Sequence, residues 1–169
     1  MKKIIITLLL VLAVVFSVSA LSTNRIPGTN ETFYWPEKNI DWDCFSSDGI
    51  TIYSADYEDP DTLYTAHVQV WSLDIDLDEY IRYSIMEGFI EGSANTAGNA
   101  IDSYDGEFLE STWDEDSCSN EYVYNVLGLD VYGGTKARFI NDNTLVCFAY
   151  EYIEGCGKDV KWMLKSLVL

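Results

Sequence analysis

The stretch from residue 121 to residue 153, EYVYNVLGLDVYGGTKARFINDNTLVCFAYEYI, decides the fold class of this chain. It contains three runs rich in β-branched and aromatic residues, a composition that is typical of strands. These runs cover residues 121–132, 135–140 and 144–153. Gly133-Gly134 and the segment NDN (141–143) separate the runs and predict short hairpin turns. Strands joined by turns this short are antiparallel, so the stretch predicts an antiparallel sheet.

Further strand-like runs extend this sheet toward the N-terminus. They are TFYW (32–35), DGITIYSAD (48–56), TLYTAHVQVW (62–71) and GEFLESTW (106–113). In the third of these runs, apolar residues alternate with Thr65, His67 and Gln69, and this period of two is the mark of a strand with one buried face. The sequence therefore predicts strands both before and after its central helical segment.

Two amphipathic segments predict helices. The first spans residues 77–91 and carries apolar residues at helical spacing, and the polar segment GSANTAGNA (92–100) predicts a loop after it. The second places Val160, Met163 and Leu164 on one face near the C-terminus. The predicted order is β-β-α-β-β-β-β-α, with the short run 32–35 as an extra first strand. The fold class is α+β: an antiparallel β-sheet with two packed helices.

The acidic segment WSLDIDLDEY (71–80) raises the question of a calcium site. Both EF-hand registers fail, because residues other than glycine occupy the position of the sharp turn. A helix start fits instead, with Asp76 as the N-cap, Glu79 as its reciprocal capping partner, and Ile75 packing on Tyr80. The segment therefore predicts a cap rather than a dedicated metal site.

The N-terminus has the pattern of a secretory signal peptide. Lys2 and Lys3 precede an apolar run and a small-residue cleavage site ending at residue 20. We predict a signal peptide over residues 1–20, a flexible leader over 21–31, and one α+β domain over 32–169. The expected location is secreted or periplasmic, with no membrane insertion after cleavage.

Four cysteines, Cys44, Cys118, Cys147 and Cys156, follow the predicted signal peptide. An even number in an exported domain predicts two disulfides, for which three pairings are possible. Zinc is the competing interpretation, but there is no C-x-x-C pair and a single histidine. We predict no resident cofactor or metal.

The charge is strongly negative. The predicted mature chain holds all 28 acidic residues and 8 of the 10 basic ones, a formal charge of −20. Such a surface repels nucleic acid and speeds encounter with cationic partners. We expect the partner to be a protein, with a basic one favoured, and not a nucleic acid.

Little in the sequence predicts catalysis. His67 is the only histidine, and it lies inside a predicted strand with no nucleophile motif nearby. The acidic loops 56–61 and 114–117 are the alternatives for weak calcium binding, although solvated loops are more common. Paired carboxylates of a hydrolase stay open as an alternative, because acidic residues are plentiful and no pair stands out.

The tyrosines are the best candidates for a contact surface. Tyr122, Tyr124 and Tyr132 alternate with apolar neighbours, so we predict that the three share one face of the sheet. Tyrosines on a sheet surface are typical contacts for protein or sugar partners. The alternative is that a helix covers this face and the rings belong to the core.

The order of elements, with DGITIYSAD (48–56), TAHVQVWSLDIDLDEYIRYSIMEGF (65–89) and KWMLKSLVL (161–169), resembles the Mog1/PsbP-type α+β sandwich of small exported proteins. The resemblance covers most of the predicted mature chain and implies a binding or assembly role without catalysis. It carries over no motif residues. Together these features predict an exported, disulfide-stabilised binding protein, with inhibitor or immunity proteins as one version. The alternative is an extracellular hydrolase that uses carboxylates, with or without calcium.

Overall fold

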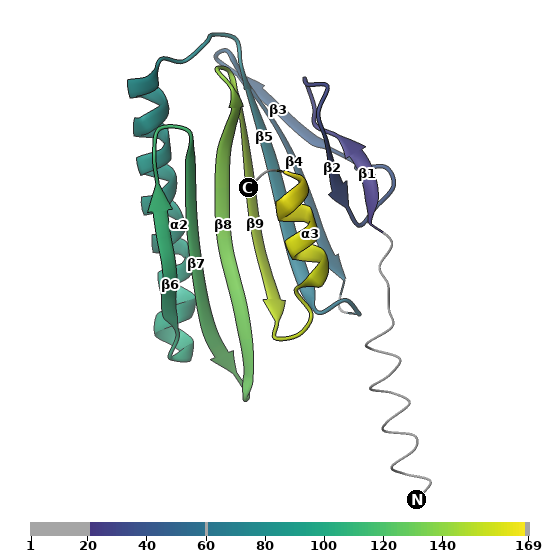
Figure 1. Cartoon of the computed structure of the whole chain (residues 1–169), viewed down its shortest axis with the longest axis vertical. Coiled ribbons are helices and arrows are strands. Elements are labelled where there is room, and N and C mark those ends of the chain that lie inside the picture. The colour runs from purple at the N-terminus through teal and green to yellow at the C-terminus, as the bar shows by residue number, and fades with distance from the viewer. Residues whose placement is uncertain (1–20, 60, 168–169) are drawn as a thin grey trace, which may run out of the picture.

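The computed structural model of the chain describes residues 21–59 and 61–167 (Figure 1). Nine strands and two helices make up this part of the chain. In order they are β1 (Ser22–Arg25), β2 (Thr32–Trp35), β3 (Asp43–Ser47), β4 (Ile50–Asp59), β5 (Tyr64–Leu73), α2 (Glu79–Tyr104), β6 (Glu107–Trp113), β7 (Ser117–Val126), β8 (Leu129–Asn141), β9 (Thr144–Ile153) and α3 (Lys158–Ser166). The predicted α+β class is confirmed.

Seven strands form one antiparallel sheet in the order β3-β4-β5-β9-β8-β7-β6. Strands β1 and β2 form a separate hairpin. Helix α2 packs on one face of the sheet, which we call the α2 side. Helix α3 and the β1–β2 hairpin pack on the opposite face, which we call the α3 side (Figure 1). The two helices are therefore separated by the sheet.

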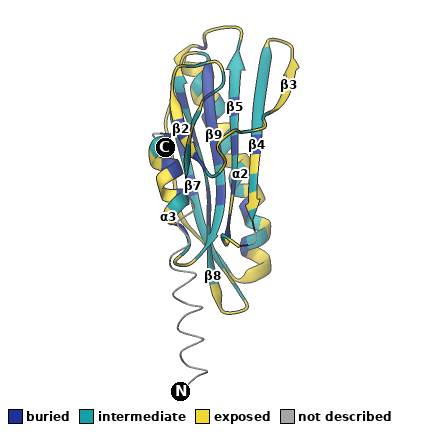
Figure 2. Cartoon of the chain, turned by 90° about the vertical axis from the view of Figure 1, so that its right-hand side faces the viewer, coloured by how far each residue is buried: buried dark blue, intermediate teal, exposed yellow. Residues whose placement is uncertain are grey.

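The larger core lies on the α3 side. The aromatic rings of Trp35 and Phe148 meet edge to face at 6.5 Å, and both side chains are fully buried. Val68 of β5 and Met163 of α3 are also fully buried in this cluster. Figure 2 shows β9 in dark blue, the colour of buried residues, along much of its length. Burial of apolar surface here is the main stabilising contribution.

Helix α2 crosses its side of the sheet diagonally. In its third turn, Phe89 contacts Trp71 of β5 with ring centroids 5.5 Å apart. In its last turn, Tyr104 stacks on Tyr124 of β7 at 5.6 Å. The helix therefore moves from the middle of the sheet toward the β6–β7 edge. The Asp59 end of β4 is left open to solvent on this side.

Helix α2 is longer than predicted and begins two residues later than predicted. It runs through residues 92–100, which we predicted as a loop, because Ala97 and Ile101 are buried against the sheet. Packing of this face outweighs the cost of interior glycines, about 1 kcal/mol each. The N-cap is Asp78 and not Asp76, since Asp78 Oδ1 accepts a hydrogen bond from the Ile81 backbone N–H at 2.9 Å.

The predicted hydrophobic staple is also absent from the helix start. Ile75 is 65% exposed and Tyr80 is 79% exposed, so neither side chain packs on the core. Leu77 takes the buried position instead, and its backbone N–H donates to the Asp142 carbonyl at 2.8 Å. The chain is thus tied to the β8–β9 turn before the helix begins.

The β7–β8 hairpin turns at Leu127-Gly128 and not at Gly133-Gly134. Leu127 and Gly128 have φ of 54° and 86°, the left-handed pair that a two-residue hairpin turn requires. Gly133 and Gly134 instead lie inside β8, facing tyrosine rings of the neighbouring strands. The turn at residues 142–143 between β8 and β9 agrees with the prediction.

The predicted leader is part of the fold. Residues Ser22–Arg25 form β1, and Ile26 is 2% exposed in the α3-side core. The polar Pro27-Gly28 segment makes the hairpin turn, with a φ of 74° at Gly28. Strand β3, which no alternation in the sequence indicated, adds an exposed edge next to β4. The predicted signal peptide lies outside the described residues.

The predicted disulfides are wrong for this structure, in which all four cysteines are free. Cys118 and Cys147 face the α2 side on either side of Ala137, two strands apart, which is about 10 Å at normal strand spacing. A disulfide needs Cα atoms within about 7 Å. Cys44 lies on the exposed edge strand β3, three strands from β9, and Cys156 lies beyond the far end of β9.

Candidate functional site

A polar groove lies on the α2 side, where the diagonal course of α2 leaves the sheet uncovered. Its volume is about 320 Å³, and its walls come from β4, β5, β9 and the middle of α2. We call it the acidic groove and define it by Asp56, Glu58, Thr65, His67, Glu151 and Tyr122. None of the described residues that line it is Lys or Arg. The groove therefore concentrates negative charge in a concave surface.

His67 and Asp56 form one contact in this groove. They are paired across β5 and β4, so their side chains leave the sheet on the same face. His67 Nδ1 lies 2.6 Å from Asp56 Oδ1, and the His67 side chain is 35% exposed. His67 thus lies inside a strand, as predicted, and its ring is oriented by a carboxylate.

Glu151 is held in place by two tyrosines. The hydroxyl groups of Tyr122 and Tyr124 donate to Glu151 Oε1 at 3.0 and 3.1 Å. The two rings stack at 6.2 Å, and Tyr104 of α2 extends the stack. Burial, followed by the nearby Glu151 carboxylate, raises the pKa of Tyr124 to about 12 and also raises the pKa of Tyr122. Both phenols therefore remain donors at neutral pH.

Gly133 makes this arrangement possible. Tyr122, Gly133 and Glu151 form one row across β7, β8 and β9. A Cβ atom on Gly133 would lie 2.4 Å from the Tyr122 ring, far inside van der Waals contact. The tyrosine therefore reaches Glu151 by lying over a position that has no side chain.

Tyr132 lies on the other side of the sheet, so the prediction that the three tyrosines share one face is wrong. The turn at residues 127–128 pairs Tyr132 with Val123 and Tyr124 with Val131. Residues paired across two strands point to the same face, so Tyr132 lies opposite to Tyr122 and Tyr124. The sequence pattern treated residues 121–132 as one strand, and the hairpin inside this run reverses the alternation.

A matching row exists on the α3 side. There Glu121, Gly134 and Tyr150 form a row across β7, β8 and β9, so the glutamate lies on β7 and the tyrosine on β9, the reverse of the α2 side. The Tyr150 hydroxyl donates to Glu121 Oε1 at 3.3 Å, and Lys136 Nζ lies 2.8 Å from the same oxygen. Burial, followed by the Glu121 carboxylate, raises the pKa of Tyr150. Each side of the sheet thus has one tyrosine-to-glutamate bond over a glycine.

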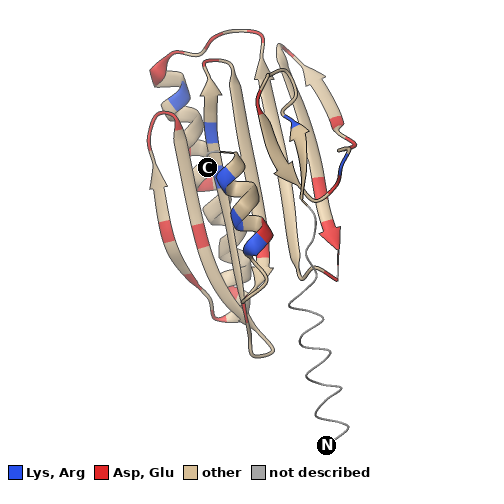
Figure 3. Cartoon of the chain, turned by 45° about the vertical axis from the view of Figure 1, so that its right-hand side comes forward, with Lys and Arg blue, Asp and Glu red and all other residues tan. Residues whose placement is uncertain are grey.

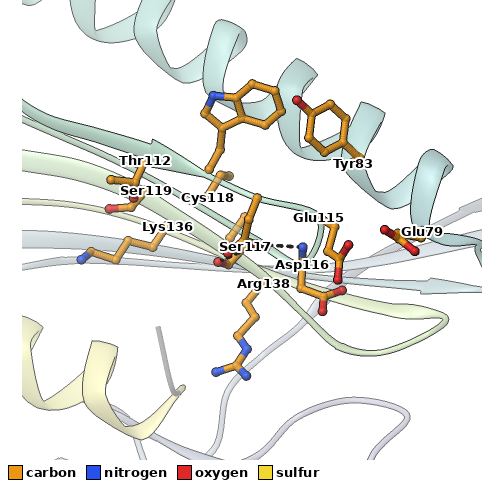
Figure 4. Close-up of a pocket in the computed structure, with 13 residues that line it drawn as sticks. Glu79, Tyr83, Thr112, Glu115, Asp116, Ser117, Cys118, Ser119, Lys136 and Arg138 are labelled. Atoms are coloured by element: carbon orange, nitrogen blue, oxygen red, sulfur yellow. Dashed lines mark hydrogen bonds between the residues drawn. The ribbon is translucent and has the colours of Figure 1, made fainter.

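The acidic loop between β6 and β7 borders a hollow of about 790 Å³ (Figure 4). Asp114 Oδ1 accepts hydrogen bonds from the backbone N–H groups of Asp116 and Ser117, and these bonds lower the pKa of Asp114. Asp116 pairs with Arg82 at 3.1 Å. These carboxylates shape the turn and anchor α2. The second predicted acidic loop, residues 56–61, is wrong in part, because residues 56–59 belong to strand β4, from which Asp56 and Glu58 line the acidic groove.

The carboxylates of the acidic groove are spread rather than convergent. Glu58, Thr65 and Glu151 form a row across three strands, which places the two glutamates about 10 Å apart at normal strand spacing. Within residues 21–59 and 61–167, no group of three or more His, Cys, Asp or Glu is placed to hold a metal ion. The arrangement suits several separate cationic groups better than one ion.

A buried acceptor lies at the inner end of the groove. Asn120 is 1% exposed, and its Oδ1 has no hydrogen-bond partner within the described chain. Its Nδ2 donates to the Ser93 hydroxyl at 3.4 Å. Asn120 belongs to the row Asn120–Thr135–Ala149–His67–Asp56 that crosses the groove floor.

The sequence indicated Asp56 and Glu58 only as part of an acidic segment for weak calcium binding, and it did not indicate Glu151 as a site residue. Asp56, Glu58 and Glu151 belong to different strands, and only the register of β4, β5 and β9 brings them together. Within the described residues no helix is both long enough and apolar enough to cross a membrane. A scan against models of protein families finds no match, and no curated protein matches the sequence.

Proposed function

We propose that this chain is a non-catalytic binding protein whose acidic groove receives the cationic side chains of a basic protein partner. The observation that carries the proposal is the groove itself, which is lined by Asp56, Glu58 and Glu151 and by no described Lys or Arg. Charge complementarity of this kind chiefly provides specificity and speed of association.

The spacing of the carboxylates favours an extended ligand. Glu58 and Glu151 lie about 10 Å apart across the sheet, while Asp56 and Glu58 are two residues apart on β4, about 7 Å. Lysine and arginine side chains of a folded partner are spaced over similar distances. A partner surface with two or three such side chains thus fits the groove better than a single ion does.

The groove is also organised before a partner arrives. Glu151 is fixed by the hydroxyl groups of Tyr122 and Tyr124, and the Asp56 carboxylate contacts His67. Side chains that are already ordered lose less conformational entropy on binding.

The net charge of the whole sequence, −18, supports the same conclusion. A negative surface accelerates encounter with cationic proteins and slows it with anionic ones. Inhibitors and immunity proteins of basic enzymes are one class with this requirement. The predicted exported location and the hydrolase alternative stay predictions.

The proposal is tested with a labelled lysine-rich peptide, whose binding is followed by fluorescence anisotropy at low and high salt. The variant Asp56→Asn with Glu58→Gln removes two groove carboxylates. The matched control, Glu37→Gln with Asp41→Asn, removes two exposed carboxylates from the segment between β2 and β3. We expect about tenfold weaker binding by the groove variant, which corresponds to about 1.4 kcal/mol.

The control variant is expected to bind as the unmodified protein does. If both variants lose the same affinity, the peptide responds only to net charge, and the groove is not the binding site. If the unmodified protein does not bind the peptide even at low salt, the proposed function is wrong.

A further inference from the structure

The cations of this acidic chain are concentrated on one side of the sheet. Of the eight Lys and Arg among the described residues, five belong to β8 and α3: Lys136, Arg138, Lys158, Lys161 and Lys165. Figure 3 shows them as blue bands along α3 and at the upper part of the strand behind it. The remaining three, Arg25, Lys38 and Arg82, are scattered. This segregation sets the α3 side apart from the acidic groove.

Three of these cations, Lys136, Lys161 and Lys165, line a groove between α3 and the sheet, which we call the basic groove. Lys136 faces the α3 side because it is paired with buried Phe148. Lys161 and Lys165 form the helical wall of a hollow of about 320 Å³ whose floor includes Tyr150 and Tyr152. Lys136 also borders the separate, larger hollow next to Arg138, whose lining holds four carboxylates and is not part of the basic groove.

The spacing of the cations is regular along both walls. Lys136 and Arg138 are two residues apart on β8, about 7 Å along the strand. Lys161 and Lys165 are one helical turn apart on α3, about 6 Å along the axis. Neither of these two lysines makes an ion pair within the described residues, and both are exposed.

Aromatic rings form the floor next to these charges. Tyr132 stacks on Tyr152 with centroids 5.6 Å apart, and Tyr152 stacks on Tyr150 at 6.1 Å. Exposed Trp162 lies beside Lys165, whose ammonium group is 5.3 Å from the ring centroid. The carboxylate of Glu121 on this floor is engaged by Lys136 and Tyr150.

We propose that the basic groove binds a linear acidic glycan, a polysaccharide that carries carboxylate or sulfate groups. The exposed lysines of the helical wall pair with the anionic groups, and the partly exposed rings of Tyr132 and Tyr152 offer apolar surface to the sugar faces. This site is separate from the acidic groove and lies on the opposite face of the sheet.

Two arguments favour a glycan over other anionic chains. The tyrosine ladder gives a stacking surface that an acidic peptide of Asp and Glu does not use. A nucleic acid carries a charge on every nucleotide and meets stronger long-range repulsion from a chain of charge −18. A glycan with more widely spaced charges meets weaker repulsion and is attracted mainly by the lysines of the groove. At physiological salt this attraction acts over about 8 Å.

The test measures binding of the full protein to immobilised hyaluronate, with one carboxylate per disaccharide, and to κ-carrageenan, with one sulfate per disaccharide. Neutral dextran, polyglutamate and single-stranded DNA serve as comparison surfaces. The groove variant is Lys161→Gln with Lys165→Gln. The matched control is Arg25→Gln with Lys38→Gln, which removes two exposed cations from the β1–β2 hairpin region. The two charged glycans distinguish carboxylate from sulfate as the recognised group, and preference for either one supports the proposal.

We expect binding to at least one charged glycan that falls about tenfold in the groove variant and is unchanged in the control. Tyr132→Leu is expected to weaken glycan binding while leaving any residual polyglutamate binding unchanged. The proposal is overturned if no charged glycan binds, or if the two double variants behave alike. Polyglutamate or DNA bound as tightly as the glycans would show that the groove accepts a different class of partner.

Discussion

The two sides of the sheet use the same strands in different ways. On the α3 side, β4 and β5 present Ala55, Val68 and Val70, all buried beneath the hairpin and α3. On the α2 side, the same two strands present Asp56, His67 and other polar residues, which stay open because α2 runs diagonally toward β7. The covered side provides the core, and the uncovered side provides the acidic groove. Because helix α2 crosses the sheet at an angle, it leaves part of β4 and β5 uncovered, and this uncovered part forms the acidic groove.

Strand β8 is where the two sides are most alike. Its adjacent residues Gly133 and Gly134 point to opposite faces, and on each face a tyrosine crosses the glycine to reach a glutamate. The two links run in opposite directions between β7 and β9. On the α2 side the carboxylate belongs to the acidic groove, and on the α3 side it is neutralised by Lys136. The same arrangement, a tyrosine that crosses a glycine to reach a glutamate, therefore occurs in two grooves of opposite charge.

Replacing either glycine by alanine should destabilise the protein, and the loss of stability should be larger for Gly134, whose row lies on the α3 side. A Cβ on Gly134 would lie 2.7 Å from the hydroxyl of buried Tyr150 and 2.8 Å from the Asn120 backbone carbonyl, which cannot move aside. We expect Gly134→Ala to lower the free energy of unfolding by about 2–3 kcal/mol. Gly133→Ala should cost about 1 kcal/mol, because half-exposed Tyr122 can swing away at the loss of one hydrogen bond. Urea denaturation measures both, and equal losses would contradict the asymmetry.

Alkaline pH should lower the stability of the protein through the two buried thiols on the α2 side, Cys118 and Cys147. Burial raises the pKa of Cys118 to about 11, above its ordinary value of 9.0, and raises the pKa of Cys147 as well. Folding thus favours the protonated thiol, and its contribution is complete below pH 9 and is lost as the pH rises toward 11. We expect the free energy of unfolding to fall by on the order of 2 kcal/mol through Cys118 over this range.

Replacement of Cys118 by alanine should make this decline less steep. The measurement is urea denaturation of both proteins at several pH values between neutral and the upper end of that range. If stability declines with the same slope in Cys118→Ala, other groups cause the effect, such as Tyr124 and Tyr150, whose pKa values are also raised.

The helix start gives the smallest expected effect. Asp78→Ala removes the hydrogen bond from the Ile81 backbone N–H and should cost about 1 kcal/mol. Asp76→Ala, two residues earlier, should leave stability nearly unchanged. Thermal or chemical denaturation of the two variants separates the positions, and a larger loss for Asp76→Ala would place the cap where the sequence first suggested it.

Much of the architecture could be predicted from periodicity. The alternation in β5, the apolar runs of β9 and the NDN turn at 141–143 led to an antiparallel α+β sheet with two helices, as observed. These features are local, because each depends on residues that are neighbours in the chain. The α3 helix was also predicted from its spacing of apolar residues.

The remaining features depend on contacts between distant residues. The glycines at 133 and 134 are turn formers in isolation, and only the tyrosines of β7 and β9 explain why they lie within a strand. Ile26 follows a polar segment, and only the core beneath the hairpin shows that it is buried. The acidic groove draws its carboxylates from β4 and β9, and two of them, Glu58 and Glu151, are more than ninety positions apart in the sequence. Tyr132 was misplaced because one unrecognised turn inverts every side chain that follows it.

The edges of the sheet have a consequence for behaviour at high concentration. Strands β3 and β6 are exposed along their whole length, and free edges of this kind invite pairing with another copy and aggregation. At β6 the register shifts between Phe108 and Glu110, an irregularity that interrupts a continuous ladder. Asp43 and Asp48 flank the other edge. The abundant negative charge therefore also keeps an open sheet soluble, and raising the salt concentration should favour self-association through these edges.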